Sequence, residues 1–187
     1  MIERRVPLAI EEAVRRVMDF AGHGLLEMVP IELAYGRVLA EDLKADQDIP
    51  AFDRSPYDGF AIRAEDTLNT SNEHPTIFEV IGEIGAGSVF PQKVAPLQAV
   101  RIMTGAQIPE GCSAVVMLEL AREIKNDGKT YIEIKRSYKH GDNISFQGEE
   151  TRKDDILVKK GTKINPGVMA LLATFGYSQV PVAKKPV

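Results

Sequence analysis

Hydrophobic positions repeat with two different spacings along the chain, which predict helices near its two ends and strands between them. Residues 9–21 place apolar side chains at helical spacing behind acids in the first turn, where the helix dipole favours negative charge. The glycines of segment 22–24 are expected to end this helix. Asn165 and Pro166 are typical of a helix N-cap and first helical position, and Gly176 is typical of the residue beyond a helix end. The pattern therefore predicts a second helix that begins at Pro166.

From about residue 46 the pattern changes to short β-prone runs separated by turn signals. The predicted strands are 60–63, 77–81, 99–103, 114–118 and 131–134. Segment 126–128 (Asn-Asp-Gly) predicts a hairpin turn. The glycines of segment 82–87 have the wrong spacing for a dinucleotide-binding fingerprint, so we interpret them as a turn between strands. Short strands at this spacing favour a small barrel or sandwich.

The segments before and after this β-rich part contain both strand-like and helical patterns. Further strands are predicted at 28–33, 156–158, 162–164 and 179–182, with a short helical turn at 35–40. We expect the first and last segments to pack on each other, with the β-rich part inserted between them. The predicted fold class is mixed α/β plus β, elongated overall: a small discontinuous α/β domain over 1–46 and 141–187, and an inserted β-barrel-like domain over 47–140.

Composition narrows the functional classes. The chain is 44% hydrophobic, which is enough for a core, and it carries a net charge of -4 with its basic residues scattered among acids. Nucleic-acid binding, which needs a basic stripe, is therefore not expected. Cys112 is the single cysteine, so no intrachain disulfide forms, and no apolar run reaches the roughly 18 residues of a membrane span. A cytoplasmic protein without a membrane partner is the expectation.

Histidine and cysteine often bind metals or act in catalysis, but we expect neither role for them in this chain. The three histidines, His23, His74 and His140, match no paired-ligand spacing and are interpreted as isolated surface residues. Cys112 follows a turn and has no neighbouring base that the sequence identifies, so we interpret it as a bystander thiol.

Three polar clusters are candidates for a site. Asp58 precedes a glycine at the end of a loop rich in Asp, Pro and Ser, Thr104 ends a strand beside a glycine, and Glu150 stands in a charged loop. Each has a purely structural alternative: an Asx turn for Asp58, a Ser/Thr turn for Thr104 and a solvated acidic face for Glu150. On residue types alone these structural alternatives are favoured.

The three clusters occur, in this order, inside longer motifs that resemble those of the MoeA family of molybdopterin molybdenumtransferases, whose animal relative is the gephyrin E domain. Segment 52–63 reads FDRSPYDGFAIR, segment 101–119 reads RIMTGAQIPEGCSAVVMLE, and segment 143–150 reads NISFQGEE. The ending 160–182 also fits the family. The resemblance runs from about residue 8 to the end of the chain.

The resemblance implies an architecture of four domains, in which a discontinuous α/β domain is interrupted by a β-rich second domain. The family continues into a pterin-binding third domain and a fourth β domain. The chain ends at Val187, before the Ser-Thr-Gly-Asp-Glu-Leu motif of the third domain, so it is expected to hold the first two domains only. Alone it is expected to be inactive.

The resemblance also implies an activity. The full-length enzyme would insert molybdate into adenylylated molybdopterin with release of AMP, assisted by Mg²⁺. Members are homodimers, and the molybdopterin-adenylylating protein is the expected upstream partner. The alternative is a non-catalytic dimerisation or scaffolding module.

By position in the motifs, Asp58, Thr104 and Glu150 are the expected catalytic residues. Asp58 is also the expected metal ligand, and Ser55 and Arg101 are expected to bind cofactor. Glu150 stands where the family carries Asp, so its carboxylate is carried one methylene further from the backbone.

Overall fold

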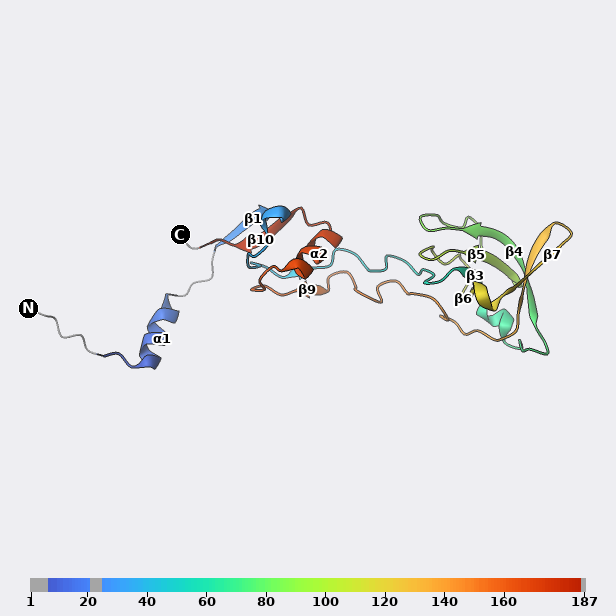
Figure 1. The fold of residues 1–187 in the computed structure, drawn as a ribbon, viewed down its shortest axis with the longest axis horizontal. Coiled ribbons are helices and arrows are strands. Elements are labelled where there is room, and N and C mark those ends of the chain that lie inside the picture. The colour runs from blue at the N-terminus through green and yellow to red at the C-terminus, as the bar shows by residue number, and fades with distance from the viewer. Residues whose placement is uncertain (1–6, 21–24, 186–187) are drawn as a thin grey trace, which may run out of the picture. The chain divides into compact units, whose positions relative to one another are not determined.

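A computed structural model describes residues 7–20 and 25–185 (Figure 1). The chain divides into two compact units. We call residues 1–45 and 154–187 the α/β unit, and residues 46–153 the sheet unit. The second junction lies at 153/154 and not at the expected 140/141. The intervening residues hydrogen-bond to the sheet unit: Val115 N–H donates to Asp142 O (3.0 Å) and Ile49 N–H to Thr151 O (2.8 Å).

Segments from both ends of the chain build the α/β unit, as expected. Strand β1 (Leu26–Pro30) pairs antiparallel with β10 (Gln179–Ala183), and β2 (Leu43–Lys44) pairs antiparallel with β9 (Ile156–Val158). One apolar cluster joins these strands to helix α2 (Pro166–Thr174), and it draws its side chains from both halves of the unit. The predicted packing of the first and last segments is confirmed.

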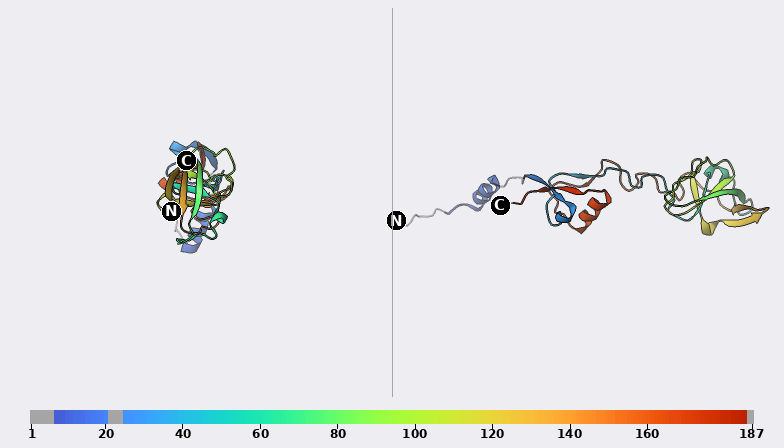
Figure 2. Two further views of the ribbon diagram at one scale, coloured as in Figure 1. Left: turned by 90° about the vertical axis from the view of Figure 1, so that its right-hand side faces the viewer. Right: turned by 90° about the horizontal axis from the view of Figure 1, so that it is seen from above.

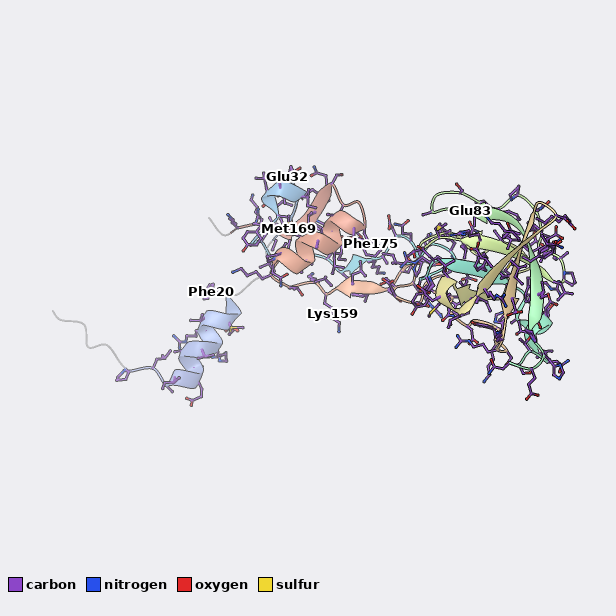
Figure 3. All side chains as sticks on the ribbon, turned by 45° about the vertical axis from the view of Figure 1, so that its right-hand side comes forward. Phe20, Glu32, Glu83, Lys159, Met169 and Phe175 are labelled. Atoms are coloured by element: carbon purple, nitrogen blue, oxygen red, sulfur yellow. The ribbon has the colours of Figure 1, made fainter. Side chains whose placement is uncertain are left out.

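Helix α2 has the expected ends. The Asn165 side chain accepts a hydrogen bond from Val168 N–H (3.0 Å) and so satisfies one free donor of the first turn. Gly176 has φ +69°, the left-handed conformation that only glycine adopts without strain. Val168 and Leu172 are buried against the strands, and Figure 3 labels Met169 on this helix and Phe175 at its C-cap.

Three local predictions for the α/β unit were wrong. Ile31–Leu33 (η1) is a 3₁₀ turn and not a continuation of β1. Segment 35–40 is not helical, because Gly36 turns the chain at φ +76° and Val38 and Leu39 then form bridges with Lys163 and Val182. Of segment 162–164, only Lys163 makes a bridge. The conformation of these segments is set by the distant residues with which they pair, and the local sequence pattern does not reveal those residues.

Helix α1 (Ile10–Asp19) is shorter than predicted, and its glycine stop at 22–24 lies outside the described residues. Its apolar face is exposed: the exposed fraction is 78% for Ile10, 69% for Val17 and 91% for Phe20, which Figure 3 labels. The helix has no buried residue. Its stripe at helical spacing is therefore not part of either core.

The strands of the sheet unit, drawn in Figures 1 and 2, form one six-stranded sheet. Their order in the sheet is β6-β3-β5-β4-β8-β7. The strands are β3 (Gly59–Ile62), β4 (Thr76–Ile84), β5 (Gln98–Ile102), β6 (Ala114–Met117), β7 (Arg122–Asn126) and β8 (Lys129–Ile134), with 3₁₀ turns η2 (Ala64–Thr67) and η3 (Leu118–Leu120) between them. Within the described residues no pairing joins β6 to β7. This strand order is that of an open sheet, and the barrel-like description is not confirmed.

Two predictions about turns had opposite outcomes. The hairpin at 126–128 is confirmed, because Asp127 (φ +49°) and Gly128 (φ +75°) connect β7 to β8 with positive φ at both central positions. The glycine segment 82–87 is only partly a turn. Gly82 continues β4 beyond an irregularity after Val80, and the strand ends at Ile84.

Both faces of the sheet are covered by apolar side chains. Phe60 and Ile62 of β3 belong to one cluster, and Ala61 between them belongs to another. All residues of β3 are buried. This explains why β3 has a continuous apolar sequence, as strands buried on both faces do. The sheet supplies a rigid platform for the loops at its ends.

Candidate functional site

The three motif segments meet in the sheet unit. Arg54, from the first motif, forms bridges with Gln107 of the second and Ser145 of the third. Its N–H donates to Ser145 O (2.9 Å), and Ile108 N–H donates to Asp53 O (2.9 Å). Backbone pairing therefore holds three loops side by side although they lie far apart in the sequence.

Asp58 and Thr104 form the centre of this arrangement. Asp58 directly precedes β3 and Thr104 follows β5, and these strands are antiparallel with Gly59 opposite Ile102, so both residues stand at the same end of the sheet. Asp58 Oδ1 accepts hydrogen bonds from Thr104 N and from Thr104 Oγ1, each at 2.7 Å. The Asp58 carboxylate thus bonds a second loop and not its own backbone, as an Asx turn would require.

Electrostatics keep the Asp58 carboxylate ionised. The backbone N–H of Thr104, then its hydroxyl, and to a smaller extent the charge of Arg101 hold the pKa of Asp58 below its usual range. Both hydrogen bonds to Asp58 that the described residues supply go to Oδ1. Because Asp58 is exposed, its carboxylate is accessible from solvent.

Arg101 lies on the sheet beside this pair. It stands opposite Phe60 across β3 and β5, and its guanidinium carbon is 5.9 Å from the centre of the Phe60 ring. Its Nη1 donates to Glu123 Oε1 (2.9 Å) of β7. Both side chains border a groove of about 440 Å³ that also includes Glu83, which Figure 3 labels on β4.

Ser55, expected to contact a ligand, has other contacts in the structure. It is fully buried. Its hydroxyl donates to Tyr57 O (2.5 Å) and accepts from Tyr57 N–H (3.2 Å). The hydroxyl is therefore committed to its own loop.

Glu150 is joined to the first motif by a different contact. Its Oε1 lies 3.2 Å from Arg54 Nη2, and its N–H donates to Ile49 O (3.0 Å). Both side chains of the pair are substantially exposed. The structure thus brings Asp58, Thr104 and Ser55 into one hydrogen-bonded cluster, while Glu150 is held by the residue before Ser55.

A second groove shows residues that motif reading did not single out. It has a volume of about 320 Å³, and all three motifs line it: Phe52, Asp53, Gln107–Cys112 and Gln147. Asp53 Oδ1 accepts from Gln147 N–H (2.8 Å), and Gln147 Nε2 donates to Asp48 Oδ2 (2.8 Å). Asp53 and Gln147 lie inside the quoted motifs, and that position is the only sequence signal that could have pointed to them.

Within residues 7–20 and 25–185, no group of three or more His, Cys, Asp or Glu side chains could hold a metal ion. A metal bound here would need oxygens from a ligand or from water in addition to Asp58. Burial raises the pKa of the Cys112 thiol to about 12, so the thiol stays protonated. No helix of the described part of the chain is long and apolar enough to cross a membrane.

Comparisons with known proteins identify relatives of this chain. Residues 8–176 match the family described as "MoeA N-terminal region (domain I and II)". The molybdopterin molybdenumtransferase of Bacillus subtilis (strain 168) is 56% identical over 187 residues, which cover 100% of this chain and 44% of that protein. The enzyme of the same name from Staphylococcus epidermidis is 49% identical, covering 99% of this chain and 43% of that protein.

The fold is also similar to solved structures. The crystal structure of the molybdopterin biosynthesis moeA protein from Pyrococcus horikoshii OT3 aligns with a TM-score of 0.85 at 38% identity, covering 94% of this chain and 46% of that one. The chain spans less than half the length of the relatives that it matches. It belongs to the family of the MoeA N-terminal region, domains I and II.

Proposed function

We propose that this chain supplies the loop-borne part of a molybdopterin molybdenumtransferase site, in which molybdate is inserted into adenylylated molybdopterin and AMP is released. The observation that carries the proposal is the hydrogen-bonded pair of Asp58 and Thr104, which joins two family motifs across 46 residues. The relatives, similar over the whole chain, are named molybdopterin molybdenumtransferase, and this name supports a transfer of molybdenum to molybdopterin. The adenylylated form of the substrate and the release of AMP are part of the proposal. The place of this reaction is molybdenum cofactor biosynthesis.

In this proposal Asp58 acts as a fixed negative charge. Two donors of Thr104 orient the carboxylate and stabilise its charged form, which lowers its pKa. Asp58 Oδ2 is the ligand that this chain offers to Mg²⁺. Magnesium commonly takes one or two carboxylates together with phosphate oxygens and waters, so a single carboxylate fits a site that the adenylylated substrate completes. The metal would neutralise charge on the phosphate.

We assign a separate role to each of the remaining site residues. The Thr104 hydroxyl donates its hydrogen bond to Asp58. Its oxygen lone pairs can still accept a hydrogen bond from a ligand or from a metal-bound water. Arg101 contributes positive charge near Asp58 and suits an anionic substrate. Glu150 contributes a carboxylate from the third motif, and it pairs with Arg54 of the first.

A homodimer and a cytoplasmic location accompany this function. The apolar face of α1, with Ile10, Val14 and Val17 exposed, and the exposed Met28 of β1 are available for a partner surface. The molybdopterin-adenylylating protein is the proposed upstream partner because it makes the substrate. The same exposed face supports the alternative function, a non-catalytic dimerisation or scaffolding module.

Replacing the matching region of the Bacillus subtilis relative with this chain tests the proposal. Asp58→Asn in that chimera removes the charge and retains an oxygen acceptor for Thr104. We expect molybdate insertion to fall on the order of a hundredfold, as for loss of one electrostatic group at a reacting centre. Asp127→Asn, at the β7–β8 turn, is the matched control and should retain activity. Full activity of Asp58→Asn with an intact dimer would favour the scaffolding alternative.

A further inference from the structure

Ser55 is one of the residues that join the Asp58 loop to the Thr104 loop. Its N–H donates to Ala106 O (3.0 Å), and its carbonyl accepts from Gly105 N–H (2.8 Å). These two partners directly follow Thr104. The backbone of Ser55 therefore fixes how far apart the two loops lie.

The hydroxyl of Ser55 fixes the direction of the chain beyond this junction. It closes a turn over two residues by donating to Tyr57 O and accepting from Tyr57 N–H. Asp58 is the next residue. Because both the N–H and the carbonyl of Tyr57 are held, the Cα of Asp58 has little freedom to move. The direction of the Asp58 carboxylate is restricted with it.

Burial makes this hydroxyl unusual. Ser55 is one of the few fully buried polar residues of the described chain, whereas Tyr57, Asp58 and Thr104 are all exposed. An exposed loop held only by exposed contacts would be mobile, because water competes for each hydrogen bond. Since water does not reach Ser55, its two bonds persist while those around them compete with solvent.

We propose that Ser55 is a positioning residue, which acts on the proposed site through Asp58 and does not itself contact substrate. This inference rests on the proposed function for its catalytic meaning, although its structural content concerns only the Asp58–Thr104 geometry. Without the hydroxyl, the turn at Tyr57 opens, Asp58 samples other directions, and its two bonds to Thr104 are made for a smaller part of the time.

Nuclear magnetic resonance titration of the Asp58 carboxyl carbon in this chain tests the proposal without any turnover. In Ser55→Ala we expect the pKa of Asp58 to rise toward its ordinary range. The amide proton of Thr104 should move upfield as its bond to the carboxylate weakens. An unchanged Asp58 titration in folded Ser55→Ala would overturn the proposal.

Thr67→Val is the matched control. Thr67 is another fully buried hydroxyl of the sheet unit, with bonds to Ala64 O (2.7 Å) and Tyr138 N–H (2.8 Å). Its loss should lower the free energy of unfolding but leave the Asp58 pKa unchanged. An equal Asp58 shift in Thr67→Val would show general loosening of the unit and would also overturn the proposal.

A measurement on the unmodified chain covers the case in which Ser55→Ala does not fold. Tyr57 is exposed, so its amide hydrogen should exchange at the free-peptide rate unless Ser55 Oγ holds it. We expect exchange slower by about fivefold or more, as one hydrogen bond provides. Exchange at the free-peptide rate would contradict the proposal. Because neither measurement depends on activity, they separate its failure from failure of the proposed function.

Discussion

Asp58 Oδ1 accepts two hydrogen bonds from Thr104, one from the backbone N–H and one from the hydroxyl, each at 2.7 Å. One carboxylate oxygen thus holds both donors of a residue that lies 46 positions further along the chain. Asp58 itself is exposed. This relationship connects the fold to its proposed chemistry, because the same two bonds orient the charge and lower its pKa.

Thr104→Val separates the two bonds. The variant loses the hydroxyl donor but keeps the backbone N–H, so the pKa of Asp58 should move only part of the way back to its usual range. Carbon-detected titration of Asp58 measures this shift. The control is Thr130→Val on β8, because valine and threonine are both β-branched and both suit a strand. It should leave the titration of Asp58 unchanged. Identical curves for Thr104→Val and the unmodified chain would exclude the hydroxyl bond.

The low pKa of Asp58 predicts a direction for acid unfolding. The carboxyl has a lower pKa when folded than its unfolded value of about 3.9, so its stabilising contribution is complete above that value. The contribution is lost as the pH falls through the lower folded pKa. Asp48, bonded by Lys153 N–H and Gln147, acts in the same direction.

Urea unfolding at several pH values checks this. We expect the free energy of unfolding of the unmodified chain to fall between about pH 5 and pH 2, and to fall less in Asp58→Asn. Asp48→Asn should reduce the fall separately. The same pH dependence in Asp58→Asn as in the unmodified chain would contradict the folded-state bonds of Asp58.

Gly59→Ala should destabilise the sheet at strand β3, which begins directly after Asp58. A Cβ at Gly59 would lie 2.0 Å from Val116 O on the neighbouring strand β6, and backbone on both sides prevents a small local shift. We expect a loss of about 3 kcal/mol or more, as for severe overpacking. Gly85→Ala is the control, because a Cβ there meets nothing within 4 Å. Thermal unfolding compares the two, and similar stability of both variants would count against the close β3–β6 approach.

Cys112 should react slowly in the folded chain. With its pKa raised to about 12 by burial, far less thiolate is present at pH 8 than in an unfolded chain. The greater nucleophilicity of a high-pKa thiolate offsets part of this, which leaves alkylation roughly a hundredfold slower. Iodoacetamide labelling with and without denaturant measures the ratio. Rapid labelling of the native chain would mean that Cys112 is accessible and ionised.

The sequence by itself determined what depends on neighbouring residues. The Asn165 cap, the Gly176 stop and the Asp127–Gly128 turn were all predicted, because each is set by one or two backbone conformations. The motif series likewise identified the family that the comparisons show.

Only the tertiary structure decided how distant segments meet. It places residues 141–153 with the sheet unit, arranges the strands of that unit in one six-stranded sheet, and leaves the apolar face of α1 exposed. It also turns the Asp58 carboxylate to Thr104 and buries Ser55 beneath them. The physical reason is that such contacts depend on the register of β3 against β5 and on packing across the sheet, and local periodicity specifies neither.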